Sequence, residues 1–227
     1  MIRNRQIAFW FRTCAAVGCL IGILAALDIH HGRFNSVQLL YFTFQSNFIV
    51  LIAFVVLAVK TRKDMRANGK IGSCHYFPLI HASLVFNMII VALIFWLGIA
   101  PFITNTEALL TFGNFATHLI NVCFIVGDYA LFSQGRHLTR KTPFLFLIFP
   151  FFYVVQASIL GFAGVEFTST YTDGIYSFPY PFMDWYRFGG WTILLILALA
   201  VGILAVGYIM YFIDSRRKAE PAGPSSS

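Results

Sequence analysis

The stretch FGGWTILLILALAVGILAVGYIMYFI, residues 188–213, carries no charged side chain and is longer than the roughly 20 apolar residues that cross a bilayer as a helix. Five further stretches of similar apolar character precede it. The predicted spans are 8–27, 37–59, 76–99, 108–132, 144–163 and 188–213. The sequence therefore predicts an all-α, polytopic membrane helix bundle with six transmembrane helices. Residues 1–215 would form this single six-span membrane domain, and 216–227 a tail that is first basic and then disordered.

The composition supports the same class of protein. Of 227 residues, 59% are hydrophobic and 11% are charged, whereas soluble domains carry about a quarter charged residues. The formal net charge is +7, but the Lys and Arg residues lie in short segments between the apolar stretches and form no basic domain. The lipid bilayer is therefore the expected partner, and we expect no nucleic-acid partner. The sequence does not indicate an oligomeric state.

The distribution of positive charge predicts the orientation of the helices. With the N-terminal end, the segments 60–75 and 133–143, and the residues after the last span on one side, the Lys and Arg residues divide 14 to 2. The two on the other side are Arg33 and Arg187. Because cytoplasmic loops are enriched in Lys and Arg, both termini are predicted to be cytoplasmic, in a multi-pass protein of the cell membrane.

The N-terminal segment has two interpretations. The basic residues of MIRNR, followed by an apolar stretch, resemble a secretory signal peptide. The apolar stretch is long, however, and Arg12 interrupts its beginning, so we favour a first span that is retained. Gly18 and Gly22 are a pair of small residues four positions apart, a spacing suited to close helix packing.

The fourth predicted span carries a stripe of polar residues. Asn114, His118, Asn121 and Asp128 are separated by four, three and seven positions, which returns each to the same side of a helix with about 3.6 residues per turn. Polar groups inside a span are expensive in hydrocarbon and usually mark a functional site. The alternative is that they only bind helices to one another.

A second polar group lies near the outer end of the second span. Thr43, Ser46 and Asn47 share one helix face, whereas Gln45 points elsewhere. At 1.5 Å per residue, Thr43 lies roughly 9 Å and His118 roughly 15 Å below the outer boundary. Both belong to the outer half of the membrane, so the two side chains could meet. From the residues alone, this group is as consistent with packing as with chemistry.

Asp128 is predicted to have a structural role. It lies ten residues beyond His118, or roughly 15 Å along a regular helix, so it cannot orient that imidazole in a Thr–His–Asp triad. Its level matches that of His81, near the cytoplasmic end of the third span. We therefore predict a structural polar pair between His81 and Asp128.

No residues in the sequence have the spacing of metal ligands. The histidines include an adjacent pair at 30–31, but neighbouring residues do not share a helix face, and no HExxH motif is present. His81 and His118 lie at different predicted depths, which disfavours paired haem ligands. We expect no metal and no cofactor, with a haem or metal site as the lesser alternative.

Three features together resemble a known family. They are YFTFQSN at 41–47, His118 in the fourth span, and SFPYPFMDW at 177–185 before the last span. This pattern is similar to the androgen-induced protein family, which includes the androgen-dependent TFPI-regulating proteins, and especially to its prokaryotic membrane-protein branch. The resemblance covers about residues 5–215. It implies a multi-span membrane hydrolase that cleaves fatty acid esters of hydroxy fatty acids, with Thr43 as nucleophile and His118 as its histidine.

The implied reaction assigns roles to the neighbouring residues. His118 would take the proton of the Thr43 hydroxyl as that oxygen attacks an ester carbonyl. Amide N–H groups of Gln45, Asn47 or Asn114 would stabilise the oxyanion, and Asn121 would orient His118. The lipid ester substrate would enter sideways from the bilayer. The alternative function is a non-enzymatic lipid-binding or transport protein that uses the same cavity.

Overall fold

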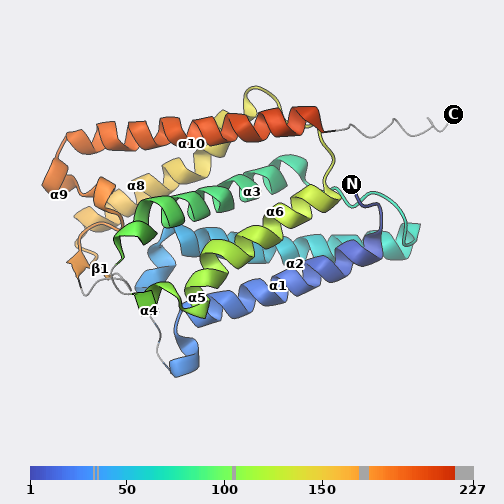
Figure 1. The fold of residues 1–227 in the computed structure, drawn as a ribbon, viewed down its shortest axis with the longest axis horizontal. Helices are drawn as coiled ribbons and strands as arrows, with labels where there is room; N and C mark the ends of the chain where they lie inside the picture. Colours follow the sequence, from blue (N-terminus) through green and yellow to red (C-terminus); the bar gives the residue numbers. More distant parts are fainter. Residues whose placement is uncertain (33, 35, 104–105, 169–173, 218–227) are drawn as a thin grey trace.

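The computed structural model describes residues 1–32, 34, 36–103, 106–168 and 174–217, and in this part the chain is a bundle of helices with one short β-hairpin (Figure 1). Six of the described helices are long and apolar enough to cross a membrane. They are Arg5–Ala26, Phe42–Asn68, Pro78–Phe102, Phe112–Phe132, Thr142–Phe162 and Trp191–Arg216. The predicted all-α, six-span, multi-pass membrane fold is confirmed. The predicted disordered tail lies, from residue 218 onward, outside the described residues.

Several spans are made of more than one element. In chain order the elements are α1 (Arg5–Ala26), η1 (Ile29–His31), η2 (Ser36–Leu40), α2 (Phe42–Asn68), α3 (Pro78–Leu93), η3 (Ile94–Ile99), η4 (Ala100–Phe102), α4 (Thr106–Leu109), α5 (Phe112–Phe115), η5 (Ala116–Ile120), α6 (Asn121–Phe132), α7 (Thr142–Phe146), α8 (Ile148–Phe162), β1 (Phe167–Thr168), β2 (Ile175–Tyr176), η6 (Pro181–Met183), α9 (Trp185–Phe188) and α10 (Trp191–Arg216). The turns η3 and η5 are π-helical, and the other η elements are 3₁₀ turns.

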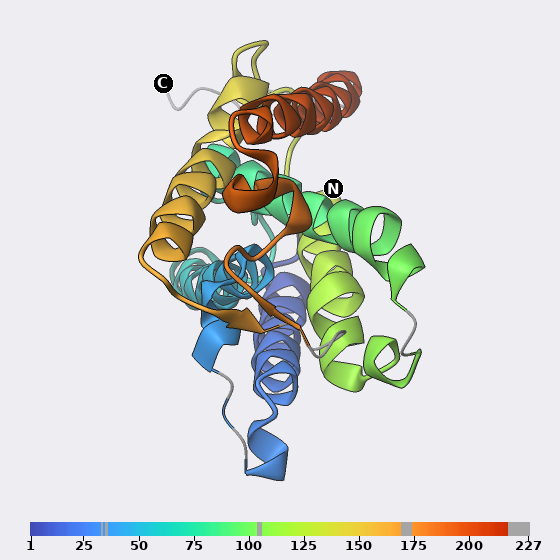
Figure 2. The ribbon, with the colours of Figure 1, turned by 90° about the vertical axis from the view of Figure 1, so that its left-hand side faces the viewer.

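The two ends of the bundle differ in content. The N-terminus and the end of α10 lie together at one end, and α4, α9 and the hairpin lie at the other (Figure 1). Viewed down the helices, α3 lies in the interior, where it packs against α2, α6, α7 and α10 (Figure 2). The helix α1 packs against α2, α5 and α6.

Two helices begin later than predicted. The second span begins at Phe42 and not at 37, because Ser36–Leu40 forms a separate 3₁₀ turn and Tyr41 is extended, with φ −80° and ψ 145°. The fourth begins at Phe112, where the Thr111 side chain accepts a hydrogen bond from the Asn114 backbone N–H. Thr43 is therefore in the first turn of its helix, nearer the helix end than the predicted depth placed it.

Small residues bring α1 against the fourth span. A Cβ atom added at Gly18 would lie 2.8 Å from the Phe124 ring, and one at Gly22 would lie 2.6 Å from the Ala116 Cβ. A Cβ atom at Gly113 would lie 2.6 Å from the Ala26 backbone. The close packing predicted for the two α1 glycines is confirmed, and it fixes α1 against the segment that carries His118.

A buried ion pair joins α1 to α6. Arg12 Nε donates to Asp128 Oδ1 at 2.7 Å and Arg12 Nη2 to Asp128 Oδ2 at 3.0 Å, and neither side chain is exposed. The guanidinium also donates to the Thr61 hydroxyl at 2.6 Å and to the Cys74 carbonyl at 2.9 Å. His81 Nε2 lies 3.4 Å from Asp128 Oδ2 without the alignment of a hydrogen bond. The predicted His81–Asp128 pair is thus present, but the main partner of Asp128 is Arg12.

A second polar cluster fastens the loop after α6 to the end of α10. Asp214 Oδ2 accepts the backbone N–H groups of His137 and Leu138, each at 3.0 Å. The Tyr129 hydroxyl donates to Asp214 Oδ1 at 3.2 Å.

His75 lies near this cluster, and burial lowers its pKa to about 4. The neutral His75 ring accepts a backbone N–H from the same loop at its Nδ1, which a protonated ring could not do.

Candidate functional site

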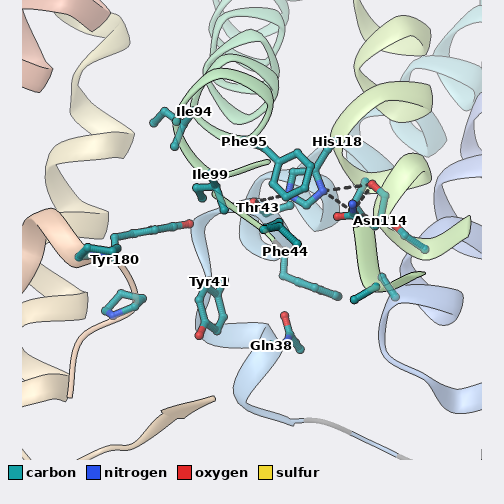
Figure 3. Close-up of a pocket in the computed structure, with 18 of the residues that line it drawn as sticks. Gln38, Tyr41, Thr43, Phe44, Ile94, Phe95, Ile99, Asn114, His118 and Tyr180 are labelled. Atoms are coloured by element: carbon teal, nitrogen blue, oxygen red, sulfur yellow. Dashed lines mark hydrogen bonds between the residues drawn. The ribbon is translucent and has the colours of Figure 1, made fainter. Parts of the chain in front are cut away.

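Thr43 and His118 lie side by side where the N-terminal end of α2 meets η5. Thr43 Oγ1 is 3.3 Å from His118 Nε2 (Figure 3). The two residues are separated by 75 positions in the chain, so the contact depends on the packing of the second span against the fourth. The structure therefore brings together the two side chains that the sequence singled out.

The other ring nitrogen of His118 has partners that determine its proton. His118 Nδ1 lies 3.1 Å from the Asn114 carbonyl oxygen and 3.2 Å from the Thr117 hydroxyl. Thr117 donates its own proton to the Gly113 carbonyl at 2.9 Å. Since a carbonyl oxygen can only accept, Nδ1 carries the proton in this network. Nε2 is then the unprotonated nitrogen, with its lone pair facing the Thr43 hydroxyl.

Two π-helical turns meet at this histidine. His118 lies in η5, and Phe95 of η3 stacks on its ring with centroids 3.8 Å apart and planes 24° apart. Trp96, also in η3, donates its indole N–H to the His118 carbonyl at 3.1 Å. Single π-helical turns inside helices occur frequently at functional sites. These contacts hold the imidazole plane in one orientation.

Two buried asparagines bind the helices on which the pair is mounted. Asn47 Nδ2 donates to the Thr43 carbonyl at 2.8 Å and to the Thr117 carbonyl at 3.1 Å. Asn121 Nδ2 donates to Asn47 Oδ1 at 2.8 Å. Asn121 therefore supports the site through Asn47, and the predicted direct contact with His118 is wrong. The orienting group is the carbonyl of Asn114.

The other predicted supporting residues lie in different surroundings. Asn114 lines the cavity beside the pair, but its side-chain Nδ2 donates to the Leu109 carbonyl at 2.7 Å. Gln45 lies on another face of α2, where its Nε2 donates to Gln156 Oε1 at 3.3 Å, and it is not among the described residues that line the cavity. Gln45 therefore does not reach the site.

A cavity of about 2400 Å³ opens beside Thr43 and His118. Typical sites for drug-sized ligands measure roughly 300–1,000 Å³, so this cavity has room for a larger molecule. Most of its wall is apolar, and it includes residues of α1, η3 and α10. Charged residues also occur among its lining, namely Asp28 after α1, and Asp184 and Arg187 at α9. A smaller space of about 60 Å³ adjoins the same pair.

Sequence reasoning missed two tyrosines at the site. Tyr180 and Tyr153 both line the smaller space with Thr43 and His118, and Tyr180 also lines the large cavity. The Tyr180 hydroxyl lies beside the Thr43 hydroxyl and points toward it (Figure 3). The available signal was the position of Tyr180 between two prolines in SFPYPFMDW, which restrict the backbone on both sides of it. Tyr153 had no such signal in its apolar helix.

Among the described residues, no group of three or more His, Cys, Asp or Glu side chains is arranged to hold a metal ion. The chemistry available at this site is that of a hydroxyl, an imidazole and two phenols beside a large apolar cavity. Comparison of the chain with protein-family models, curated proteins and solved structures finds no match.

Proposed function

We propose that this protein is an intramembrane hydrolase of lipid esters, with Thr43 as nucleophile and His118 as general base. The observation that carries the proposal is the 3.3 Å contact between Thr43 Oγ1 and the unprotonated Nε2 of His118 at the wall of a cavity of about 2400 Å³. A nucleophile within reach of a base that is itself oriented by a third group is the arrangement needed for acyl transfer. Here the third group is the Asn114 carbonyl.

The reaction follows from these contacts. Thr43 Oγ1 forms a bond to the ester carbonyl carbon while its proton passes to His118 Nε2, and the carbonyl electron pair moves onto oxygen. The pair returns to re-form the C=O bond as the alcohol oxygen departs with the proton from Nε2. Water then attacks the acyl–Thr43 ester by the same proton path. The products are an alcohol and a fatty acid, and Thr43 is restored.

The surroundings of the pair favour a lipid substrate. The cavity wall is mainly apolar and includes a few charged residues, which suits an amphipathic ester with long chains. The resemblance of YFTFQSN and SFPYPFMDW to the androgen-induced protein family supports the same class, fatty acid esters of hydroxy fatty acids. The skewed distribution of Lys and Arg supports a cell-membrane location with both termini cytoplasmic.

The proposal is tested by ester cleavage with a matched set of variants. Purified parent protein, Thr43→Ala, Thr43→Ser and His118→Ala would be incubated in detergent with esters of hydroxy fatty acids, after chromatography has shown each to be folded. We expect Thr43→Ala and His118→Ala to lose cleavage and Thr43→Ser to retain part of it, because the hydroxyl survives. Cleavage by folded Thr43→Ala at the parent rate would refute the proposal.

A second candidate function is non-enzymatic lipid binding or transport. The volume of the cavity favours it, because a carrier needs a large apolar space and no reactive pair. In that case the parent and Thr43→Ala proteins would retain the same co-purified lipids, identified by mass spectrometry, and neither would cleave them.

A further inference from the structure

Ester hydrolysis at Thr43 requires hydrogen-bond donors for the negative charge that develops on the carbonyl oxygen. Two of the amides considered from the sequence, Asn47 and Gln45, do not supply them. Both N–H groups of the Asn47 amide are engaged, by the carbonyls of Thr43 and Thr117, and Gln45 faces Gln156. The Asn114 amide already donates to the Leu109 carbonyl. Tyrosine hydroxyls in the wall of the site are the other donors beside Thr43.

Tyr180 presents a hydroxyl at the required place. It lies beside the Thr43 hydroxyl, and the phenol points toward it across the cavity (Figure 3). The Tyr180 ring stacks on Phe182, with centroids 5.4 Å apart and planes 4° apart. Pro179 and Pro181 flank it and restrict the backbone. The hydroxyl is thus held in position before any substrate binds.

Tyr153 brings a second phenol to the same point from α8. Its side chain is only 4% exposed, and its hydroxyl lies near the Phe42 backbone and Tyr180 without the geometry of a hydrogen bond to either. The Tyr153 and Tyr180 rings lie with their centroids 6.1 Å apart, and both residues line the small space beside Thr43. Folded proteins leave few buried polar atoms without a partner, and such an atom calls for a reason. A substrate oxygen would complete this site.

The protonation of Tyr180 suits a donor. Burial raises its pKa above the usual value of about 10, and the neighbouring Tyr41 raises it further. The phenol therefore keeps its proton at neutral pH and can donate it to an oxygen.

We propose that the hydroxyls of Tyr180 and Tyr153 form the oxyanion site of this hydrolase. This inference rests on the proposed function. As Thr43 Oγ1 bonds to the carbonyl carbon, the electron pair that moves onto the carbonyl oxygen is stabilised by both O–H groups. No proton leaves either tyrosine, because the only proton transferred is the one that passes from Thr43 to His118 and on to the departing alcohol.

The experiment compares Tyr180→Phe and Tyr153→Phe with Tyr208→Phe. Each change removes one hydroxyl and keeps the ring. Tyr208 is the matched control because its hydroxyl donates to the Arg140 carbonyl, away from the site. Hydrolysis of a medium-chain p-nitrophenyl ester by the full chain in detergent would be measured. We expect each site variant to lower kcat on the order of 10²-fold with little change in KM, and the control to match the parent.

A second measurement separates stabilisation of the oxyanion from simple positioning. The same variants would be assayed on the thionoester, in which sulfur replaces the carbonyl oxygen and accepts hydrogen bonds poorly. The ratio of oxygen-ester to thionoester rates should be high for the parent and should fall in Tyr180→Phe and Tyr153→Phe. A loss of packing would lower both rates together and leave the ratio unchanged, and that result would overturn the assignment.

The two proposals fail in different ways. If folded Tyr180→Phe and Tyr153→Phe cleave at the parent rate while Thr43→Ala is inactive, the oxyanion assignment is wrong and the hydrolase stands. If the parent cleaves no faster than Thr43→Ala, the hydrolase is wrong and the oxyanion site is wrong with it. If Tyr153→Phe does not fold, Tyr180→Phe decides the question alone.

Discussion

Asp128→Asn is expected to destabilise the bundle strongly while sparing the site formed by Thr43 and His118. The substitution preserves the shape of the side chain but leaves the buried Arg12 guanidinium without a counter-charge, since neither residue is exposed. Removing one partner of a buried ion pair costs about 3–5 kcal/mol. For a chain of this size, each kcal/mol shifts Tm by roughly 2–4 °C, so Tm should fall by roughly 6–20 °C.

The assay is thermal unfolding in detergent, followed by tryptophan fluorescence, with ester cleavage measured per folded molecule. Glu166→Gln is the control, because it removes a carboxylate that is exposed. A double variant, Arg12→Met with Asp128→Leu, should recover at least half of the lost Tm, because it leaves no unpaired charge. A Tm for Asp128→Asn within 2 °C of the parent, or full stability with lost cleavage, would refute the structural role.

Three further changes test the packing and the polar contacts of the bundle. Gly113→Ala should lower both Tm and ester cleavage, because the new methyl group would lie 2.6 Å from the Ala26 backbone and displace the turn that precedes His118; parent-like values for both would contradict this packing. Asn121→Ala should lower the free energy of unfolding by about 1–3 kcal/mol, because Asn47 Oδ1 loses its donor, with less than a tenfold change in turnover of the folded protein. Because burial lowers the pKa of His75 to about 4, the unfolded chain binds that proton more readily below pH 6.5, so stability present above pH 6.5 is lost as pH falls toward 4. His75→Asn should flatten the profile of Tm against pH in this window, and an unchanged slope would contradict it.

The number of spans and their approximate limits could be predicted from the sequence because long apolar stretches have few alternatives in a membrane protein. The start of the second span could not be predicted in this way. Residues 37–41 are as apolar as those that follow, and their 3₁₀ and extended geometry depends on contacts such as the hydrogen bond from the Tyr41 hydroxyl to the Thr168 carbonyl. A local pattern of hydrophobicity does not contain such contacts.

The candidate site could also be predicted only in part from the sequence, because a local pattern does not contain tertiary contacts. Thr43 and His118 stand out as polar groups at similar depth. The π-helical turns that align the imidazole with Phe95 have no recognisable pattern in the sequence. Tyr180 reaches the site from a loop far along the chain, and Arg12, which interrupts the start of the first apolar stretch, lies buried against α6. Each of these positions is decided by tertiary packing.

The most direct test of the central claim is to locate the nucleophile chemically. The purified parent protein would be treated with an alkyl fluorophosphonate, digested, and analysed by mass spectrometry to find the modified residue. We expect an adduct on the Thr43 oxygen that is absent from Thr43→Ala and forms far more slowly in His118→Ala, because the hydroxyl then lacks its base. An adduct on another residue, or ester cleavage that persists in unlabelled Thr43→Ala, would contradict it.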